Sequence, residues 1–156
     1  MNVSLRPLED SDLDAIFEQM KDPESVRMAA FTVDDPADRS AFAVHMSRVR
    51  DDPSVVQRVI DADGTIAGTI ASFRIDDRAE VTYWVDRKLW GKGIASAALL
   101  ALLGITTERP LFARAASDNA ASLRVLEKAG FQRIGVKRDY AAGRGTEIEE
   151  TILRLD

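Results

Sequence analysis

The chain has 156 residues, a length that fits one domain with a hydrophobic core of its own. Its hydrophobic fraction of 46% and charged fraction of 30% are ordinary for a globular protein. The absence of cysteine excludes disulfides and thiolate metal sites, and the single histidine, His45, excludes the usual zinc clusters. The net charge of -5 argues against general binding to a nucleic-acid backbone, which needs a basic face.

Neither the beginning of the chain nor its apolar segments predict export or membrane insertion. Residues Met1 to Arg6 lack the charged and apolar regions of a signal peptide. The longest apolar run, near Ile94 to Ile105, is too short and too interrupted to cross a bilayer. We therefore expect a cytoplasmic protein with no nucleic-acid or membrane partner.

The first 50 residues predict one strand and two helices. A short strand from Asn2 to Arg6 is closed by Pro7, and a helix with Asp10 or Ser11 as its N-cap follows. This helix has apolar residues at helical spacing, namely Leu13, Ile16, Phe17 and Met20. A second helix is expected to begin at Asp35-Pro36, where an aspartate precedes proline, with Phe42, Met46 and Val49 as its apolar stripe. The stretch between them, Lys21 to Asp34, predicts a loop with no more than a helical turn.

The middle of the chain changes to a strand pattern. Two segments rich in β-branched residues, Val55 to Ala62 and Thr65 to Ile75, are joined at Asp63-Gly64, which is a strong hairpin signal. A third strand from Ala79 to Val85 follows a polar turn. A helix from about Lys92 to Thr107 is apolar on nearly every side, as is typical of a buried helix.

The last third predicts a strand, a helix and two strands. The strand Leu111 to Ala116 leads to a helix begun by Ser117 or Asp118 that stops at a glycine cap, Gly130. Strands near Gln132 to Lys137 and Glu147 to Leu155 finish the chain. The whole order, β-α-α-β-β-β-α-β-α-β-β, predicts a single α/β domain over residues 1–156 with a mixed sheet.

The most informative segment is the turn between the third long strand and the apolar helix, Val85 to Ala95. Its two glycines, Gly91 and Gly93, let the backbone approach a ligand closely, and the first amides of the helix face outward. Together they make a site for phosphate oxygens, although a glycine turn can also serve geometry alone. A P-loop is excluded because Gly91-Lys92 is followed by Gly93, and a dinucleotide fingerprint is excluded because Ser96 stands at its third glycine.

The chain resembles the GNAT superfamily of N-acetyltransferases, and most closely its branch of ribosomal-protein N-terminal acetyltransferases. The superfamily motif Gln/Arg-x-x-Gly-x-Gly/Ala falls on residues 88–93, with Lys88 in place of Gln or Arg. The opening Leu5-Arg6-Pro7-Leu8 and the triplet Tyr83-Trp84-Val85 are similar to that branch, and residues 118–131 are similar to its second motif. The resemblance covers almost the whole chain in the right order.

The resemblance implies an α/β, GNAT-like fold, with a mixed and mostly antiparallel sheet splayed to hold acetyl-CoA and about four flanking helices. Backbone groups of Trp84 and Val85 would pair with the pantetheine arm, which Asn119 would also reach unless it is merely a helix cap. The amides from Trp90 to Ala95 would hold the pyrophosphate, and Lys92 would add charge. The implied cofactor residues are therefore Trp84, Val85, Lys88, Trp90, Gly91, Lys92, Gly93, Ile94, Ala95 and Asn119. No metal is implied.

Two residues are expected to carry the chemistry. Glu80 resembles the glutamate that acts as a base in histone-acetylating members, although it could instead lie on an exposed strand face. The tyrosine that many members use for the leaving group is replaced by Leu126 here. In the branch that the chain resembles, the serine of Asn-x-x-Ser takes that role, which points to Ser122; the alternative is a first-turn serine with no role. His45 and Trp90 are not expected to be catalytic.

The expected reaction is direct attack of a primary amine on acetyl-CoA within a ternary complex. The acceptor is either a protein N-terminal α-amine or a small amine such as a polyamine, an amino acid or an antibiotic. The Lys21 to Asp34 stretch and the segment after Tyr140 are expected to wall the acceptor site. A non-catalytic module that binds acyl-CoA is the alternative from another functional class. Both a monomer and a homodimer are compatible with the sequence.

Overall fold

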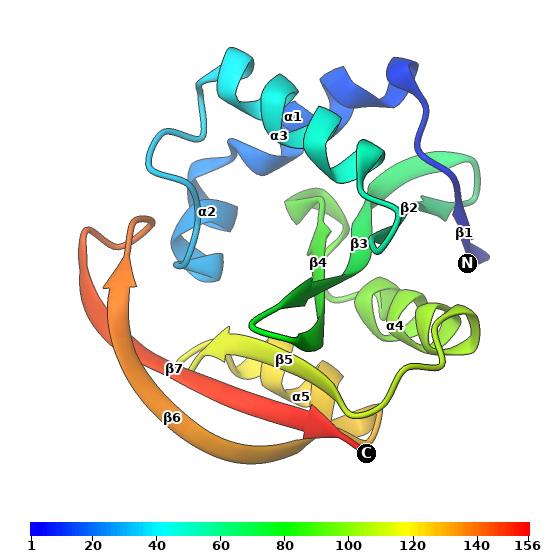
Figure 1. The fold of residues 1–156 in the computed structure, drawn as a ribbon. Coiled ribbons are helices and arrows are strands. Elements are labelled where there is room, and N and C mark those ends of the chain that lie inside the picture. The colour runs from blue at the N-terminus through cyan, green and yellow to red at the C-terminus, as the bar shows by residue number, and fades with distance from the viewer.

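A seven-stranded sheet runs through the molecule, with helices on both of its faces (Figure 1). This computed structural model describes residues 1–156. The strand order is β1-β2-β3-β4-β5-β7-β6. The strands are β1 Val3–Arg6, β2 Val56–Ala62, β3 Thr65–Ile75, β4 Arg78–Val85, β5 Leu111–Ala116, β6 Gln132–Ala141 and β7 Thr146–Leu155. The α-helices are α1 Leu13–Met20, α2 Pro23–Ala29, α3 Arg39–Asp51, α4 Ile94–Ile105 and α5 Ala120–Lys128, with 3₁₀ turns η1 Asp10–Asp12 and η2 Arg87–Leu89.

The pairing of β4 with β5 sets this sheet apart from a continuous one. Every other neighbouring pair is antiparallel, and β4 and β5 alone are parallel. They share only two residue pairs, Ala79 with Leu111 and Glu80 with Phe112. Beyond these pairs the two strands run in different directions in Figure 1. The mixed, mostly antiparallel and splayed sheet expected from the sequence is confirmed.

The helices divide between the two faces. In Figure 1, α1 and α3 lie at the top and α2 at the left, whereas α4 lies at the right and α5 lies behind β5. The largest hydrophobic cluster lies under α4, where the fully buried Leu99 and Leu102 pack with Ile60 and Leu111 from the sheet. Only one face of this helix is buried, whereas Leu100 and Ile105 are exposed, so the expectation that its apolar sequence reflects burial on nearly every side is wrong. No helix is both long enough and apolar enough to cross a membrane.

The sequence prediction was wrong about the helices before β2. The stretch Lys21 to Asp34 contains the helix α2, whose N-cap Asp22 accepts a hydrogen bond from the Ser25 amide at 3.0 Å. The helix expected at Asp35 begins instead at Arg39 and is capped by Asp38. There are therefore five α-helices rather than about four. An aspartate before proline occurs at both places, and only the first pair caps a helix.

Two boundaries in the last third also differ from the prediction. The helix α5 is capped by Asn119 rather than by Ser117 or Asp118. Ser117 continues the edge of β5 instead, because its amide donates to the Glu149 carbonyl at 3.0 Å. The strand β6 extends beyond Lys137 to Ala141, so that the β6–β7 hairpin is long enough to reach α2 (Figure 1).

Candidate functional site

A cavity of about 990 Å³ occupies the gap between β4 and β5. Its walls come from β4, the glycine turn, the first residues of α4, β5 and α5. The opposite end is closed by Met28 of α2, by Phe31 just after α2 and by Tyr140 of the β6–β7 hairpin. A single cavity therefore joins the glycine turn to the two segments that were expected to wall an acceptor.

The glycine turn leaves its backbone donors open. Gly91 and Gly93 both have a φ of 77°, and a side chain added at either would meet nothing within 4 Å. None of the amides from Gly91 to Ser96 donates a hydrogen bond within the protein, because the helix α4 begins at Ile94 and its first turn has no intrahelical partner. These donors, at the positive end of a helix of 12 residues, fit the pyrophosphate of acetyl-CoA.

Along the last residues of β4, the backbone N–H and C=O groups point alternately toward β3 and toward the gap. The Asp86 amide donates to the Ala67 carbonyl at 2.8 Å, on the side of β3. Because adjacent strand residues point their polar groups in opposite directions, the backbone of Trp84 faces β3 and that of Val85 faces the gap. The Val85 carbonyl accepts a hydrogen bond from the Trp90 indole at 2.9 Å. Trp84 lines the cavity as well, and its indole donates to the Gln19 carbonyl of α1 at 3.1 Å.

Not all cations near the glycine turn lie where the motif leads one to expect them. Lys88 and Lys92 are exposed and do not line the cavity. Arg87 pairs with Asp22 at 2.8 Å, and its hydrogen bond lowers the pKa of Asp22 to about 2. Two cations that the sequence analysis missed, Arg124 and Lys128, do line the cavity. They stand four residues apart on α5, which was the available signal that they share a face.

The carboxylates lie at the other end of the gap. Glu80 is buried, with 3% of its surface exposed, so the alternative of an exposed strand face is wrong. Its carboxylate accepts a hydrogen bond from Arg114 at 3.2 Å and lies 3.7 Å from Arg78. Glu150 is also buried and lies 3.9 Å from Arg114 and 3.7 Å from Lys137. Arg114 therefore stands between two buried carboxylates.

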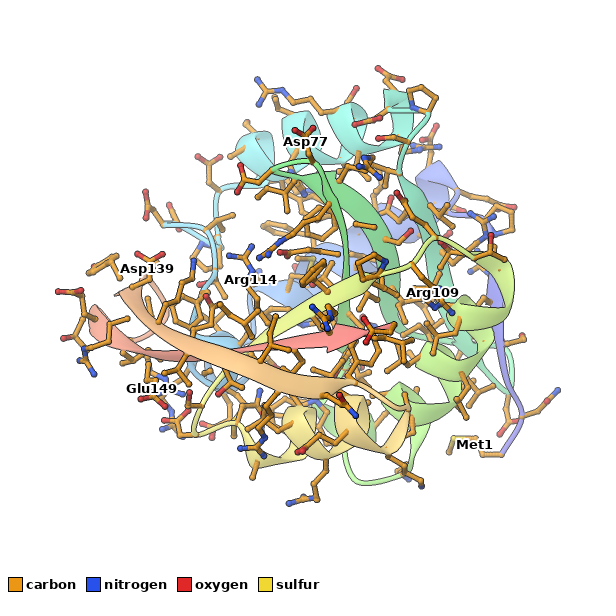
Figure 2. The ribbon with its side chains drawn as sticks, turned by 60° about the horizontal axis from the view of Figure 1, so that its bottom comes forward. Met1, Asp77, Arg109, Arg114, Asp139 and Glu149 are labelled. Atoms are coloured by element: carbon orange, nitrogen blue, oxygen red, sulfur yellow. The ribbon has the colours of Figure 1, made fainter.

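Burial raises the pKa of Glu150, and the attraction of Arg114 and Lys137 opposes that rise. Glu80, Arg114, Glu150 and Asp139 all line the cavity, and Figure 2 labels Arg114 on β5 and Asp139 on β6. The sequence analysis missed Arg114, Asp139 and Glu150. No spacing along the chain reveals them, because the antiparallel pairing of β5 with β7 and of β7 with β6 brings them together.

The first turn of α5 holds Asn119 and Ser122 at the cavity wall. The Asn119 side chain is a helix cap, since its Oδ1 accepts from the Ser122 amide at 3.2 Å, and it also lines the cavity. The Ser122 hydroxyl lies 2.7 Å from the Tyr83 hydroxyl, which comes from β4 on the other side of the gap. Burial raises the pKa of Tyr83, and its hydrogen bond with Ser122 opposes that rise. Leu126, at the position of the missing tyrosine, is buried.

The β6–β7 hairpin is fastened over the end of the cavity that lies opposite the glycine turn. The Gly143 amide donates to the Ala30 carbonyl at 2.8 Å, and a side chain at Gly143 would lie 2.4 Å from the Val26 carbonyl. The Arg144 guanidinium binds both carboxylate oxygens of Asp118, at 2.8 and 2.9 Å. His45, in contrast, is exposed on α3 and away from the cavity. No group of three or more His, Cys, Asp or Glu residues is placed to hold a metal ion.

Comparison with known proteins agrees with this geometry. The family described as "Acetyltransferase (GNAT) domain" matches residues 2–132. The protein named "Uncharacterized N-acetyltransferase p20" of Bacillus licheniformis is 28% identical over 166 residues, which cover 98% of this chain and 92% of that protein.

Two solved structures illustrate the likeness in fold. RimJ of Mycobacterium smegmatis in complex with CoA-disulfide has a TM-score of 0.82 at 22% identity, and the match covers 98% of this chain and 81% of that one. Spermidine N-acetyltransferase of Vibrio cholerae, in complex with CoA and spermine, has a TM-score of 0.79 at 18% identity, with 97% and 95% covered. At these identities the likeness shows the shared fold.

Proposed function

This chain belongs to the GNAT family of acetyltransferases, and we propose that it moves an acetyl group from acetyl-CoA to a primary amine by direct attack in a ternary complex. The observation that carries this proposal is the single cavity, which has open backbone amides at one end and buried carboxylates at the other. An acetyl donor and an amine can therefore meet without an intermediate carrier. Because acetyl-CoA is a metabolite of the cytoplasm, we propose that the protein works there.

In this proposal the first turn of α4 and the end of β4 hold the cofactor. The amides from Gly91 to Ala95 bind the pyrophosphate, and the exposed cations Lys88 and Lys92 add a positive potential outside the cavity. Val85 offers its backbone to the pantetheine arm, and Trp84, Trp90 and Asn119 shape the channel around it. Bound acetyl-CoA supplies the thioester, and the chain positions the groups around its carbonyl carbon.

The acceptor needs a base, because a primary amine carries a proton at neutral pH and cannot attack until it loses it. We propose Glu80 for this role, directly or through a water, since it is buried in the cavity wall. Glu150 is a second candidate, because burial raises the pKa of its carboxyl toward the range in which a general base works well. Arg114 holds both carboxylates in place, so removing it would disturb either base.

The leaving thiolate needs a hydrogen-bond donor at the opposite side of the reacting carbon. We propose that Ser122 supplies it, since its hydroxyl belongs to the cavity wall and Leu126 has no polar atom to offer. A serine hydroxyl is far less acidic than a thiol, so its role is to stabilise the thiolate rather than to release a proton to it.

The acceptor is a protein N-terminal α-amine or a small amine. The similar proteins named for their acceptors include a spermidine N-acetyltransferase, and the ribosomal-protein branch includes RimJ. In this chain the acceptor end is walled by Phe31, Phe73 and Tyr140 together with the carboxylates. Aromatic and acidic walls suit a protonated amine with an apolar neighbour.

The test is release of coenzyme A with a panel of acceptors. The panel contains polyamines, amino acids and short peptides that differ in their first residue, each assayed against a control without amine. Release that depends on a primary amine and is absent with its N-acetylated form is the expected result. Binding of acetyl-CoA with no turnover on any acceptor would identify a non-catalytic acyl-CoA-binding module and refute the proposal.

A further inference from the structure

We infer that Tyr83 and Ser122 act as one hydroxyl pair, in which the Tyr83 phenol orients the Ser122 hydroxyl toward the sulfur that leaves the acetyl group. This inference rests on the proposed function and adds Tyr83 to it as a positioning residue. Tyr83 belongs to β4 and Ser122 to α5, so the two hydroxyls meet from opposite walls of the cavity.

The geometry of the pair is specific. The two oxygens lie 2.7 Å apart, the usual length of a bond between hydroxyls. The Ser122 carbonyl lies farther from the Tyr83 oxygen, at 3.4 Å, and is the weaker partner. The Tyr83 ring packs against the main hydrophobic core, so the phenol cannot swing away from the gap without leaving that core.

The direction of the hydrogen bond follows from acidity. A phenol, with an ordinary pKa of about 10, is a better donor than an aliphatic hydroxyl. Burial raises the pKa of Tyr83, so the phenol keeps its proton through the neutral range and remains a donor. If the Tyr83 hydrogen points to the Ser122 oxygen, the Ser122 hydrogen must point elsewhere. The free side of Ser122 is the cavity.

The bonds of the reaction balance without another reactant. The amine nitrogen forms a bond to the acetyl carbon, and the carbon–sulfur bond breaks with its electron pair on sulfur. The proton from the amine goes to the base and then to solvent, and the thiolate takes its proton from solvent. Ser122 and Tyr83 end as they began, because they donate hydrogen bonds and transfer no proton. The phenol also polarises the serine hydroxyl, which strengthens its bond to the thiolate.

The hydroxyl pair also accounts for the absence of a tyrosine at position 126, where this chain has a leucine. Leu126 is buried with 1% of its surface exposed, and because it is a leucine, α5 has no phenol at the position where many family members have a tyrosine. The phenol of Tyr83 comes from β4 instead and meets α5 at the Ser122 hydroxyl.

The test reads the state of the thiol rather than the activity alone. Coenzyme A carrying ¹³C at the carbon next to sulfur is bound to the parent protein, and its chemical shift is followed by NMR as the pH rises. Tyr83→Phe and Ser122→Ala should each raise the pKa of the bound thiol by roughly 1–2 units, the effect of losing a hydrogen bond to a charged group. With an acceptor in hand, each should lower kcat roughly 10- to 100-fold with little change in the KM for acetyl-CoA.

Two further variants make the result specific. The double variant should be about as impaired as the worse single one, because residues that act as a unit are not additive. The matched control is Ser117→Ala, which removes one member of another hydroxyl pair, with Thr151 at 2.7 Å, outside the cavity. It should leave the bound thiol with the pKa seen in the parent.

The outcomes separate this inference from the proposed function. A folded Tyr83→Phe variant that binds coenzyme A and shows the parent's thiol pKa would overturn the pair while leaving the transferase intact. Single effects that multiply in the double variant would show that the two hydroxyls act independently, and would overturn it too. A parent protein that does not bind coenzyme A at all would refute the proposed function itself.

Discussion

Replacing Gly93 with valine should remove the stabilisation that acetyl-CoA gives to the protein. Gly93 is the N-cap of α4, with a φ of 77° and nothing within 4 Å of the place where a side chain would start. The first carbon of the new side chain therefore meets no atom of the free protein. Instead, it places a branched side chain over the open amides that we assign to the pyrophosphate, and that side chain would hold the phosphates away.

The expected size follows from mass action. A ligand at 100 times its Kd stabilises a native protein by about 2.7 kcal/mol. For a chain of this length, about 2–4 °C of melting temperature corresponds to each kcal/mol, so the parent should gain roughly 5–11 °C. The left-handed backbone costs a residue other than glycine about 1–3 kcal/mol, so the variant should melt lower even without ligand. The ligand-dependent gain, rather than the melting temperature itself, is the quantity to compare.

The assay is thermal unfolding with and without acetyl-CoA, and Gly64→Val is its matched control. Gly64 also has a positive φ, of 85°, and also has nothing within 4 Å, but it lies in the β2–β3 hairpin and does not line the cavity. The control should lose a similar amount of intrinsic stability and keep the full gain. A folded Gly93→Val variant that keeps the gain as well would refute the pyrophosphate assignment.

Three further changes test other parts of the structure. Glu80→Gln should lower turnover roughly 10²-fold or more, with most of the rate returning at high pH, where solvent alone deprotonates the amine; an unchanged turnover would move the base to another group. Gly68→Ala should destabilise the fold by about 3 kcal/mol or more in denaturant unfolding, because its Cβ would lie 1.8 Å from the Trp84 carbonyl, whereas Gly135→Ala, in open space, should be nearly neutral. Asp22→Asn should be less stable than the parent at neutral pH, with the difference closing in acid: the pKa of Asp22 is lowered from 3.8 to about 2, so its contribution is present above about pH 4 and is lost as the pH falls toward 2. Equal acid unfolding curves for Asp22→Asn and the parent would show that the pair with its arginine adds nothing.

Most helices and strands could be predicted from sequence because turn residues and apolar periodicity involve residues close together in the chain. The hairpin at Asp63-Gly64 and the helix after Gly93 were predicted because turn chemistry and periodicity act over a few residues, although Leu100 and Ile105 of that helix are exposed rather than buried. The pairs Asp22-Pro23 and Asp35-Pro36 show the limit of such signals, because they are identical in sequence but only Asp22 caps a helix. Tertiary packing decides between them.

The site likewise contains residues that could be predicted from the sequence and residues that could not. The glycine turn could be found from sequence because strand, turn and helix follow one another along the chain. The burial of Glu80 could not be found, since its environment comes from β5, which follows it by about 30 residues. Glu150 lies farther still along the chain, and its place beside Arg114 depends on the register of β7 against β5. Such contacts are set by strand pairing, which composition and spacing do not encode.

The short pairing of β4 with β5, over only two residue pairs, also affects how the two parts of the sheet are held together. All strands before the gap come from the first 85 residues, and all strands after it come from residues 111–155. Each half keeps its own antiparallel ladders, but α4 packs on β1 and β3 of the first half and also contacts α5, which packs on β5 and β6 of the second, so one hydrophobic cluster spans both halves. The seam between these two units is therefore joined by few ladder hydrogen bonds and mostly by hydrophobic packing, which is not directional. A ligand that bridges the gap would couple the two units and slow hydrogen exchange in both.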